Sequence, residues 1–302
     1  MGSQPSIVQV SKLIPEEAHQ CFDSVIRQQT NVSLKNERVK SIAIKINLCD
    51  YRCAESGATT DPEMLGALID VLHVHYPDAS ILILENDATS LETWSAFKVL
   101  GIDRIARTHN AELFNVADDS WITKTIPNGV VFQELEVPQI LETCDIFINF
   151  AKLKTNALTK TTGCLKNIFA FLRIKRKVVL HGNINQVLVD MNKVIKPDLC
   201  LVDGYIGMEG MGGPAYGRPK RCELLVSGVN PVSVDACSAR IMGFNPRRVK
   251  HIQLCSKAGL GSIRYQVETD IPQFEYSQYK FQFEYWDYVL RNLLRSRAGF
   301  ST

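Results

Sequence analysis

Short apolar runs followed by polar residues recur along the chain, at residues 41–47 (SIAIKIN), 80–87 (SILILEND) and 145–150 (DIFINF). Each run is rich in Ile, Leu or Phe, and this length and composition predict buried strands. A helix is predicted between the first two runs, because Asp61 and Pro62 are typical of a helix start and apolar residues follow at helical spacing. A strand, a helix and a second strand in this order predict a parallel strand pair.

Elements of both kinds continue through the rest of the chain. Residues 121–135 alternate apolar and polar positions around Pro-Asn-Gly, which predicts an antiparallel hairpin. The later patterns predict strands at 197–205 and 221–228, and helices at 184–195, 230–243, 245–259 and 285–299. We therefore expect an α/β fold, with a mainly parallel sheet flanked by helices and a small antiparallel hairpin insertion.

The sequence contains no linker or repeat that would divide it. We expect residues 1–302 to form a single compact α/β unit, with two interlocked lobes of about 1–150 and 151–302 as the alternative. Ligands of such sheets bind outside the carboxyl ends of the strands. The polar residues at the predicted strand ends are therefore expected to line one rim: Asn47, Glu85, Asn149 to Lys154, and Asp203.

Composition excludes two classes of partner and leaves a small molecule as the expected one. The formal net charge is only +2, so no overall field favours nucleic acid or an anionic membrane. The chain also lacks a run of ~18 apolar residues that would span a bilayer. A cytoplasmic protein that binds a small anionic substrate is expected, and a homodimer is an alternative to a monomer.

The segment 153–167 (LKTNALTKTTGCLKN) carries the strongest local concentration of positive charge. Lys152 and Lys154 would point the same way from an extended chain. Thr162 and Gly163 precede a predicted helix, whose free N–H groups suit a phosphate or a carboxylate. Lys166 would lie in the first turn of that helix, where a cation opposes the helix dipole unless an anion compensates. A solvated basic loop is the alternative.

Three further stretches contain candidate site residues. Residues 208–220 (MEGMGGPAYGRPK) are rich in glycine and proline and predict a long functional loop that contains Glu209 and Gly212. Thr60 follows the first strand and would face the same rim as Asn47. His181 is a candidate proton carrier, with an exposed or structural histidine as the alternative.

Cysteines suggest a second class of function. Nine cysteines are scattered without a C-x-x-C pair, which argues against a zinc ribbon or a ferredoxin-type cluster. No cofactor and no metal ligands are therefore predicted. A metal or iron–sulfur site, or thiol redox chemistry, through Cys49, Cys53 and Cys164 is a minority alternative.

Residues 42 to about 265 resemble the family called domain of unknown function 362. The likeness is carried by residues 45–62, 145–169, 202–219 and 230–243, whose order and spacing both fit. The resemblance implies an α/β fold, with a weaker likeness to the N-terminal domain of lactate-racemase-type proteins, and it implies no single activity. This sequence differs from the family at two motifs. The usual Lys-Pro-Asn is replaced by Lys45-Ile46-Asn47, and the usual Lys-Thr-His is replaced by Lys154-Thr155-Asn156. The ferredoxin-like domain of some members is lacking.

The sequence thus favours an enzyme that acts on an anionic organic substrate in a lysine-rich cleft. Its chemistry would be non-hydrolytic proton transfer: isomerisation, elimination, cyclisation or group transfer. A cysteine-based redox or metal protein and a non-catalytic module that binds an anionic metabolite are the alternatives. The expected catalytic residues are Lys154, Lys166, His181 and Asp203. The expected substrate-binding residues are Asn47, Thr60, Lys152, Thr162, Gly163, Asn167, Glu209 and Gly212.

Overall fold

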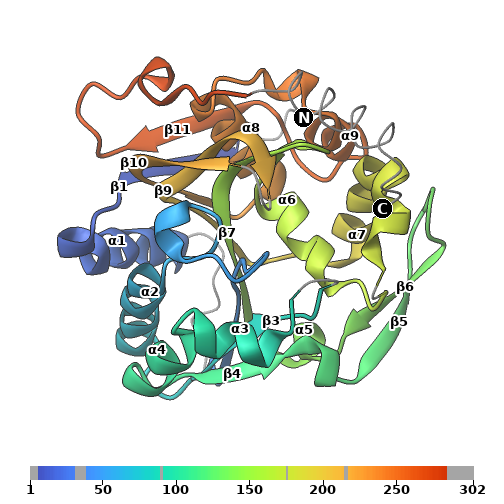
Figure 1. Cartoon of the computed structure of the whole chain (residues 1–302), viewed down its shortest axis with the longest axis horizontal. Coiled ribbons are helices and arrows are strands. Elements are labelled where there is room, and N and C mark those ends of the chain that lie inside the picture. Colours follow the sequence, from blue (N-terminus) through green and yellow to red (C-terminus); the bar gives the residue numbers. More distant parts are fainter. Residues whose placement is uncertain (1–5, 31–38, 89–90, 175, 214–216, 284–302) are drawn as a thin grey trace, which may run out of the picture.

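The computed structural model describes residues 6–30, 39–88, 91–174, 176–213 and 217–283 (Figure 1). Its strands are β1 (Ser6–Lys12), β2 (Ser41–Lys45), β3 (Ser80–Glu85), β4 (Glu112–Asn115), β5 (Trp121–Thr125), β6 (Glu134–Pro138), β7 (Ile146–Asn156), β8 (Lys160–Thr162), β9 (Leu199–Gly213), β10 (Gly217–Gly228) and β11 (Tyr265–Thr269). Its α-helices are α1 (Ala18–Thr30), α2 (Pro62–His75), α3 (Thr93–Val99), α4 (Ile102–Thr108), α5 (Ile140–Thr143), α6 (Cys164–Asn167), α7 (Ile184–Val194), α8 (Pro231–Ile241) and α9 (Lys250–Lys257). The predicted helix at 285–299 lies outside the described residues.

One large sheet runs through both halves of the sequence, in the strand order β11-β1-β10-β9-β7-β2-β3-β4. Strands β4, β3, β2, β7 and β9 are parallel to one another, whereas β10 is antiparallel to both β9 and β1. The expected α/β fold with a mainly parallel sheet is therefore confirmed. The short strand β8 pairs with the far end of β7 in antiparallel fashion.

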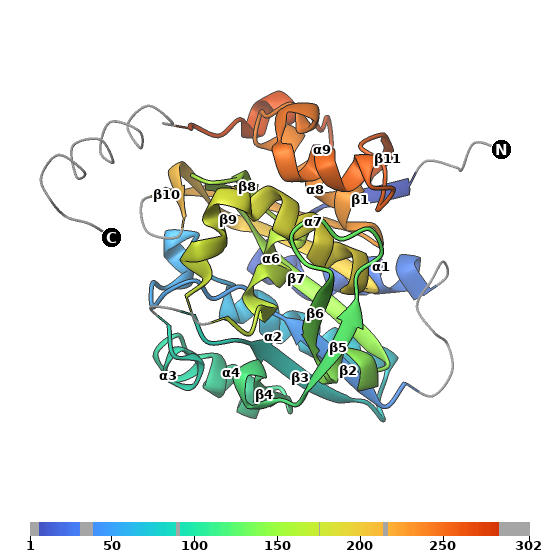
Figure 2. The ribbon, with the colours of Figure 1, turned by 90° about the vertical axis from the view of Figure 1, so that its right-hand side faces the viewer.

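Alternation along the central strands places helices on both faces of this sheet. Ile42 and Ile44 of β2 pack into an apolar cluster that contains residues of α1 and α2. Ala43, which points the opposite way, packs with Phe147 and with residues of α7. Figures 1 and 2 show the resulting layers, with α1 and α2 on one face and α6 and α7 on the other.

The predicted helix after the first strand is formed by α2. The side chain of Asp61 accepts hydrogen bonds from the N–H groups of Glu63 and Met64, and Pro62 occupies the first helical position. The helix therefore begins where the sequence indicates. It also anchors the end of the loop that follows β2 and leads into the candidate site.

The predicted hairpin is present as the two-stranded antiparallel sheet of β5 and β6. It docks on α7 through Asp190, whose carboxylate accepts hydrogen bonds from the backbone N–H groups of Val130, Val131 and Phe132. Apolar side chains from the hairpin join the cluster around α7. The hairpin therefore covers the α7 face of the molecule.

The predicted loop at 208–220 is wrong over most of its length. Residues 208–213 belong to β9 and residues 217–220 belong to β10, which pair in antiparallel fashion. Glycine serves close backbone approach here, because a Cβ on Gly207 would lie 2.7 Å from the carbonyl oxygen of Leu153. Glycine-rich sequence was therefore a poor guide to a loop at this position.

Candidate functional site

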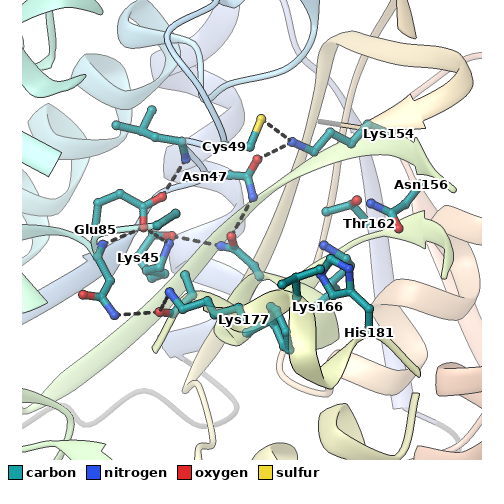
Figure 3. Close-up of a pocket in the computed structure, with 17 residues that line it drawn as sticks. Lys45, Asn47, Cys49, Glu85, Lys154, Asn156, Thr162, Lys166, Lys177 and His181 are labelled. Carbon is teal, nitrogen blue, oxygen red and sulfur yellow. Dashed lines mark hydrogen bonds and ion pairs between the residues drawn. The ribbon is translucent and has the colours of Figure 1, made fainter. Parts of the chain in front are cut away.

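A pocket of about 370 Å³ opens beyond the carboxyl ends of β2, β3 and β7, between the loop after β2 and the segment that follows β8 (Figure 3). This is the rim at which ligands of parallel sheets bind. Its polar lining comes from Lys45, Asn47, Cys49, Glu85, Asn86, Lys154, Asn156, Thr162, Lys166, Asn167, Lys177 and His181. Of the predicted site residues, the pocket thus brings together Asn47, Lys154, Thr162, Lys166, Asn167 and His181.

Among the lining residues that the structure describes, Lys45 forms the only ion pair. Its ammonium nitrogen lies 2.6 Å from Oε2 of Glu85, and both side chains are almost fully buried. The carboxylate of Glu85 also accepts hydrogen bonds from the N–H groups of Leu48 and Asn86. Burial lowers the pKa of Lys45, while Glu85 opposes that change. The pair therefore fixes the floor where β2 and β3 end, and it uses the one carboxylate that the described part of the lining contains.

Two other lysines are held by neutral oxygen atoms. The ammonium of Lys154 donates to Oδ1 of Asn47 and to the carbonyl of Ala58, both at 2.7 Å. The ammonium of Lys177, in the 3₁₀ helix η5 (Lys177–Asn183), donates to the carbonyls of Asp87 and Ala170. Burial lowers the pKa of Lys177 to about 8. These lysines are positioned without being neutralised.

Lys166 differs from the other three lysines. Within the described residues, no carboxylate or carbonyl oxygen pairs with its ammonium, which lies 5.9 Å from the centre of the Phe169 ring. Burial and the charge of Lys154 lower the pKa of Lys166 to about 8. An ammonium that is partly buried and has no counter-ion favours an anion as its missing partner.

His181 lies next to Lys166 at the pocket wall (Figure 3). Its ring centre is 6.5 Å from that of Phe169. Burial and the nearby Lys166 lower the pKa of His181, so the ring is neutral at pH 7. A neutral imidazole beside an ammonium of low pKa is a suitable pair for accepting and donating protons.

A chain of side-chain amides connects the pocket with the core. Asn47 donates to Asn167, Asn167 donates to Asn149, and Asn149 donates to the carbonyl of Cys164, at 2.8, 2.8 and 2.9 Å. Each link orients the next amide, so Oδ1 of Asn47 faces Lys154. Asn47 and Asn167 therefore position a cation, in addition to lining the pocket.

The predicted anion site at the helix start is already filled by the protein itself. The N–H groups of Cys164 and Leu165 donate to the carboxylate of Asp235, at 2.7 and 2.9 Å. Gly163 makes this approach possible, because a Cβ there would lie 2.3 Å from Asp235. Burial raises the pKa of Asp235 to about 7. Gly163 thus holds a structural contact and does not line the pocket.

Lys152 and Asp203 also lie away from the pocket. They form a fully buried ion pair at 2.5 Å, and Asp203 accepts a second hydrogen bond from the N–H of Tyr205. The register of β7 against β9 shifts between Lys152 and Lys154, so the two lysines have different surroundings despite their spacing. The expectation that both reach one ligand is wrong for Lys152.

The remaining predicted residues contribute to the framework. Thr60 accepts a hydrogen bond from the N–H of Asn47 and so closes the loop after β2. Glu209 lies 3.5 Å from the ammonium of Lys220 and accepts a hydrogen bond from the N–H of Gln282. Gly212 is part of β9. Neither Thr60 nor Glu209 is among the residues that line the pocket.

Sequence inspection placed Glu85 on the expected rim but missed the pocket roles of Lys45 and Lys177. Lys45 lies near the end of the predicted strand at 41–47, so its position was a usable signal. Lys177 follows a basic stretch in an irregular segment and has no pattern that distinguishes it from a surface lysine. Only the packing of η5 against the end of β3 brings it to the site.

The metal and thiol alternatives depend on how the cysteines and other metal-binding side chains are arranged in the described residues. Over the described ranges, no group of three or more His, Cys, Asp or Glu side chains is arranged to hold a metal ion. Of Cys49, Cys53 and Cys164, only Cys49 lines the pocket, whereas Cys53 is exposed and Cys164 is buried.

Within the described residues, no helix combines the length and the apolar character that crossing a bilayer requires.

Comparison with known proteins places this site in a family context. The chain is 30% identical over 137 residues to the thylakoid-associated protein sll1697 of Synechocystis, an alignment that covers 43% of this chain and 42% of that protein. The chain therefore spans less than half of the relative's length. Among solved structures, the lactate racemase apoprotein of Thermoanaerobacterium thermosaccharolyticum aligns with 83% of this chain and 56% of its own, at 11% identity and a TM-score of 0.41. A likeness this distant supports no transfer of fold or activity.

The match to a protein family is broader. It covers residues 42–240 and so includes the loop after β2, all of β7 and α6, and the Asp235 that caps α6. The chain belongs to the family described as Domain of unknown function (DUF362).

Proposed function

We propose that the protein is an enzyme for a small organic anion, a carboxylate or a phosphate, and that it carries out proton-transfer chemistry without hydrolysis. One observation carries the proposal: among the described residues, the pocket is lined by four lysines and a single carboxylate. That carboxylate already pairs with Lys45. Three ammonium groups of the lining thus have no anionic partner in it, which favours a ligand that brings negative charge.

The cations differ in how firmly they are held, and this suggests different roles. Lys154 is fixed by Asn47 and Ala58, so it would stabilise charge without moving. Preorganised cations of this kind stabilise an enolate or another oxyanion that develops during a reaction. Lys166, which has no such partners among the described residues, is the cation that a ligand would contact directly.

Lys166 is also the favoured proton-transfer group. Its pKa of about 8 means that a fraction of the side chain is neutral near pH 7, when it can accept a proton from carbon or oxygen. His181, neutral beside it, would exchange that proton. Isomerisation, elimination, cyclisation and group transfer all need such a group.

The test compares two charge removals with a ligand panel. Purified wild type, Lys166→Met and Lys257→Met are screened by thermal shift against organic acids and organic phosphates, and the hits are then assayed for turnover. Lys257 is an exposed lysine of α9 and serves as the matched control. Because a charge-assisted hydrogen bond contributes about 1.5–3 kcal/mol, Lys166→Met should weaken binding by ~10-fold or more.

The outcomes separate the alternatives. If anions bind equally well to Lys166→Met and wild type, the lysine pocket is not the ligand site. If Lys166→Met weakens binding but no hit is turned over by wild type, the protein is a binding module for an anionic metabolite. Turnover that is lost in Lys166→Met and retained in Lys257→Met supports the enzyme.

A further inference from the structure

Cys49 brings a nucleophilic atom into the cationic pocket. Its sulfur lies in the loop after β2, 3.4 Å from the ammonium of Lys154 and 3.3 Å from the carbonyl of Ala58 (Figure 3). The side chain is partly exposed and lines the pocket. Gly57 holds this loop against β9, since a Cβ there would lie 2.1 Å from the carbonyl oxygen of Gly207. The thiol is therefore held beside a fixed positive charge.

A second feature of the same pocket is a buried hydroxyl group that faces a possible ligand without a partner from the described residues. Thr162 lines the pocket and is only 3% exposed. Its hydroxyl oxygen Oγ1 is buried and has no hydrogen-bond partner among the described residues. Buried hydroxyl groups are almost always hydrogen-bonded. A ligand bound in the pocket would supply the hydrogen-bond partner of this one. Together with the ammonium of Lys166, the hydroxyl of Thr162 forms a donor pair that suits a carboxylate or phosphate oxygen.

We propose that Cys49 is a nucleophilic thiol that forms a covalent bond with carbon electrophiles carrying a carboxylate or phosphate group. The inference rests on the proposed function, because Lys166 and Thr162 would bind the anionic group while Cys49 attacks the carbon. Lys154 is placed to stabilise the negative charge that the sulfur carries as it loses its proton.

Iodoacetate is the simplest probe of this class. The sulfur attacks the methylene carbon, an S–C bond forms, the C–I bond breaks, and iodide leaves with the bonding electron pair. The thiol proton passes to the buffer, so atoms and charge balance without an oxidant or a cofactor. Iodoacetamide reacts in the same way but has no charge, and it therefore reports the reactivity of the thiol without anion binding.

The experiment measures the rate of alkylation at Cys49 for each reagent, by peptide mass spectrometry of the folded, reduced protein. The ratio of the iodoacetate rate to the iodoacetamide rate is compared with that of 2-mercaptoethanol in the same buffer. We expect the ratio at Cys49 to exceed the reference ~10-fold, because one charge-assisted contact lowers the barrier by about 1.4 kcal/mol. Lys166→Met should bring the ratio close to the reference, and Lys257→Met should not.

Cys53 provides an internal control in the same loop. It is exposed, and a hydrogen bond from its thiol to Glu55 raises its pKa. It should show no preference for iodoacetate, and added sulfate should protect Cys49 but not Cys53.

A ratio at Cys49 equal to or below that of 2-mercaptoethanol would overturn the proposal. The failure of the thiol and the failure of the pocket are distinguishable. If the ratio stays at the reference while anions still raise the melting temperature of wild type but not of Lys166→Met, Cys49 is not a nucleophile but the anion site stands. If neither effect is seen, both proposals are wrong.

Discussion

The lysines in and near the pocket differ in what surrounds their ammonium groups, at Lys45, Lys152, Lys154, Lys166 and Lys177. Two of them are neutralised by buried carboxylates, and two are held by amide or carbonyl oxygens. Among the described residues, the ammonium of Lys166 has no carboxylate or carbonyl partner, and it lies 5.9 Å from the centre of the Phe169 ring. At the residue scale, the partner of each ammonium decides whether the lysine is structural or available to a ligand.

The pH dependence of anion binding follows from two of these lysines. Lys166 and Lys177 both have a pKa lowered to about 8 by burial, so both lose their charge as the pH rises through 8. We expect the affinity for sulfate, whose charge is constant here, to fall ~10-fold or more between pH ~7 and ~9.5. Isothermal titration calorimetry across this range measures the change.

The variant Lys166→Met tests whether Lys166 is one of the cations whose loss of charge weakens sulfate binding. The variant should bind sulfate more weakly at pH ~7 and should lose less affinity on going to pH ~9.5 than wild type does. An affinity for wild type that is constant, or that rises with pH, contradicts the assignment of Lys166 and Lys177 as the titrating cations.

At the scale of elements, α6 is too short to hold its own position. It has four residues, and the 3₁₀ helix η4 (Ile168–Phe171) continues it. Asp235 of α8 caps its first turn, and the amide chain through Asn167 ties it to β7. Lys166 therefore reaches the pocket because two neighbouring elements fix the helix that carries it.

Removing the Asp235 cap should destabilise this arrangement. Asp235→Ala leaves the buried N–H groups of Cys164 and Leu165 unpaired, and we expect a loss of about 2–4 kcal/mol in the free energy of unfolding at pH 7. Urea denaturation measures it. Ser238→Ala on the same helix is the control and should be close to neutral, because that buried hydroxyl has no partner among the described residues. Equal stability of the two variants would show that the cap is dispensable.

The buried pair of Lys152 and Asp203 joins β7 to β9. Lys152→Met leaves Asp203 as an uncompensated buried charge and should lower the free energy of unfolding by about 3–5 kcal/mol. The double variant Lys152→Met with Asp203→Leu removes both charges and should be more stable than the single variant. Urea denaturation of the three proteins tests this, and a double variant less stable than Lys152→Met would exclude the pair as the cause.

At the scale of the whole molecule, buried ionisable groups set the response to alkaline pH. Burial raises the pKa of five thiols from 9.0 to about 12, those of Cys21, Cys144, Cys222, Cys237 and Cys255. Their stabilising contribution is complete below pH 9 and is lost as the pH rises from 9 towards 12, because the unfolded chain releases these protons first. Lys166 and Lys177 act in the opposite direction between about 8 and 10.5.

Five thiols outnumber the three lysines whose pKa burial lowers, Lys45, Lys166 and Lys177, so the net effect is loss of stability at high pH. We expect the free energy of unfolding to fall between pH ~9 and ~10.5, with disulfide formation prevented by a reductant. Urea titrations at several pH values measure the slope. A free energy of unfolding that rises over this interval would mean that the lysines dominate.

Much of the fold could be predicted from the chain itself. The runs that became β2, β3, β7 and β9 are apolar enough to identify buried strands, and Asp61 with Pro62 marked the start of α2. Strand β1, which lies between β10 and β11, and the edge strand β11 were not predicted. The sequence pattern of such short strands is weak, since much of their stability comes from the neighbours they pair with.

The pocket could be predicted only in part. Position after a strand or at the start of a helix identified six of the lining residues: Asn47, Lys154, Thr162, Lys166, Asn167 and His181. Lys152 was wrongly placed in the pocket because spacing along a strand does not reveal a shift of register. Gly163 was wrongly placed there because the start of a helix does not reveal which side chain caps it. Those facts depend on β9 and α8, which lie far away in the sequence.

The sequence by itself determined the α/β class, the order of most elements and the rim at which a ligand would bind, because apolar periodicity and helix caps are local properties. Tertiary structure alone decided which lysines are neutralised, that Asp235 occupies the start of α6, and that Cys49 shares a pocket with Lys154. The physical reason is that charge compensation and burial depend on groups far apart in the chain, which only folding brings within a few ångströms.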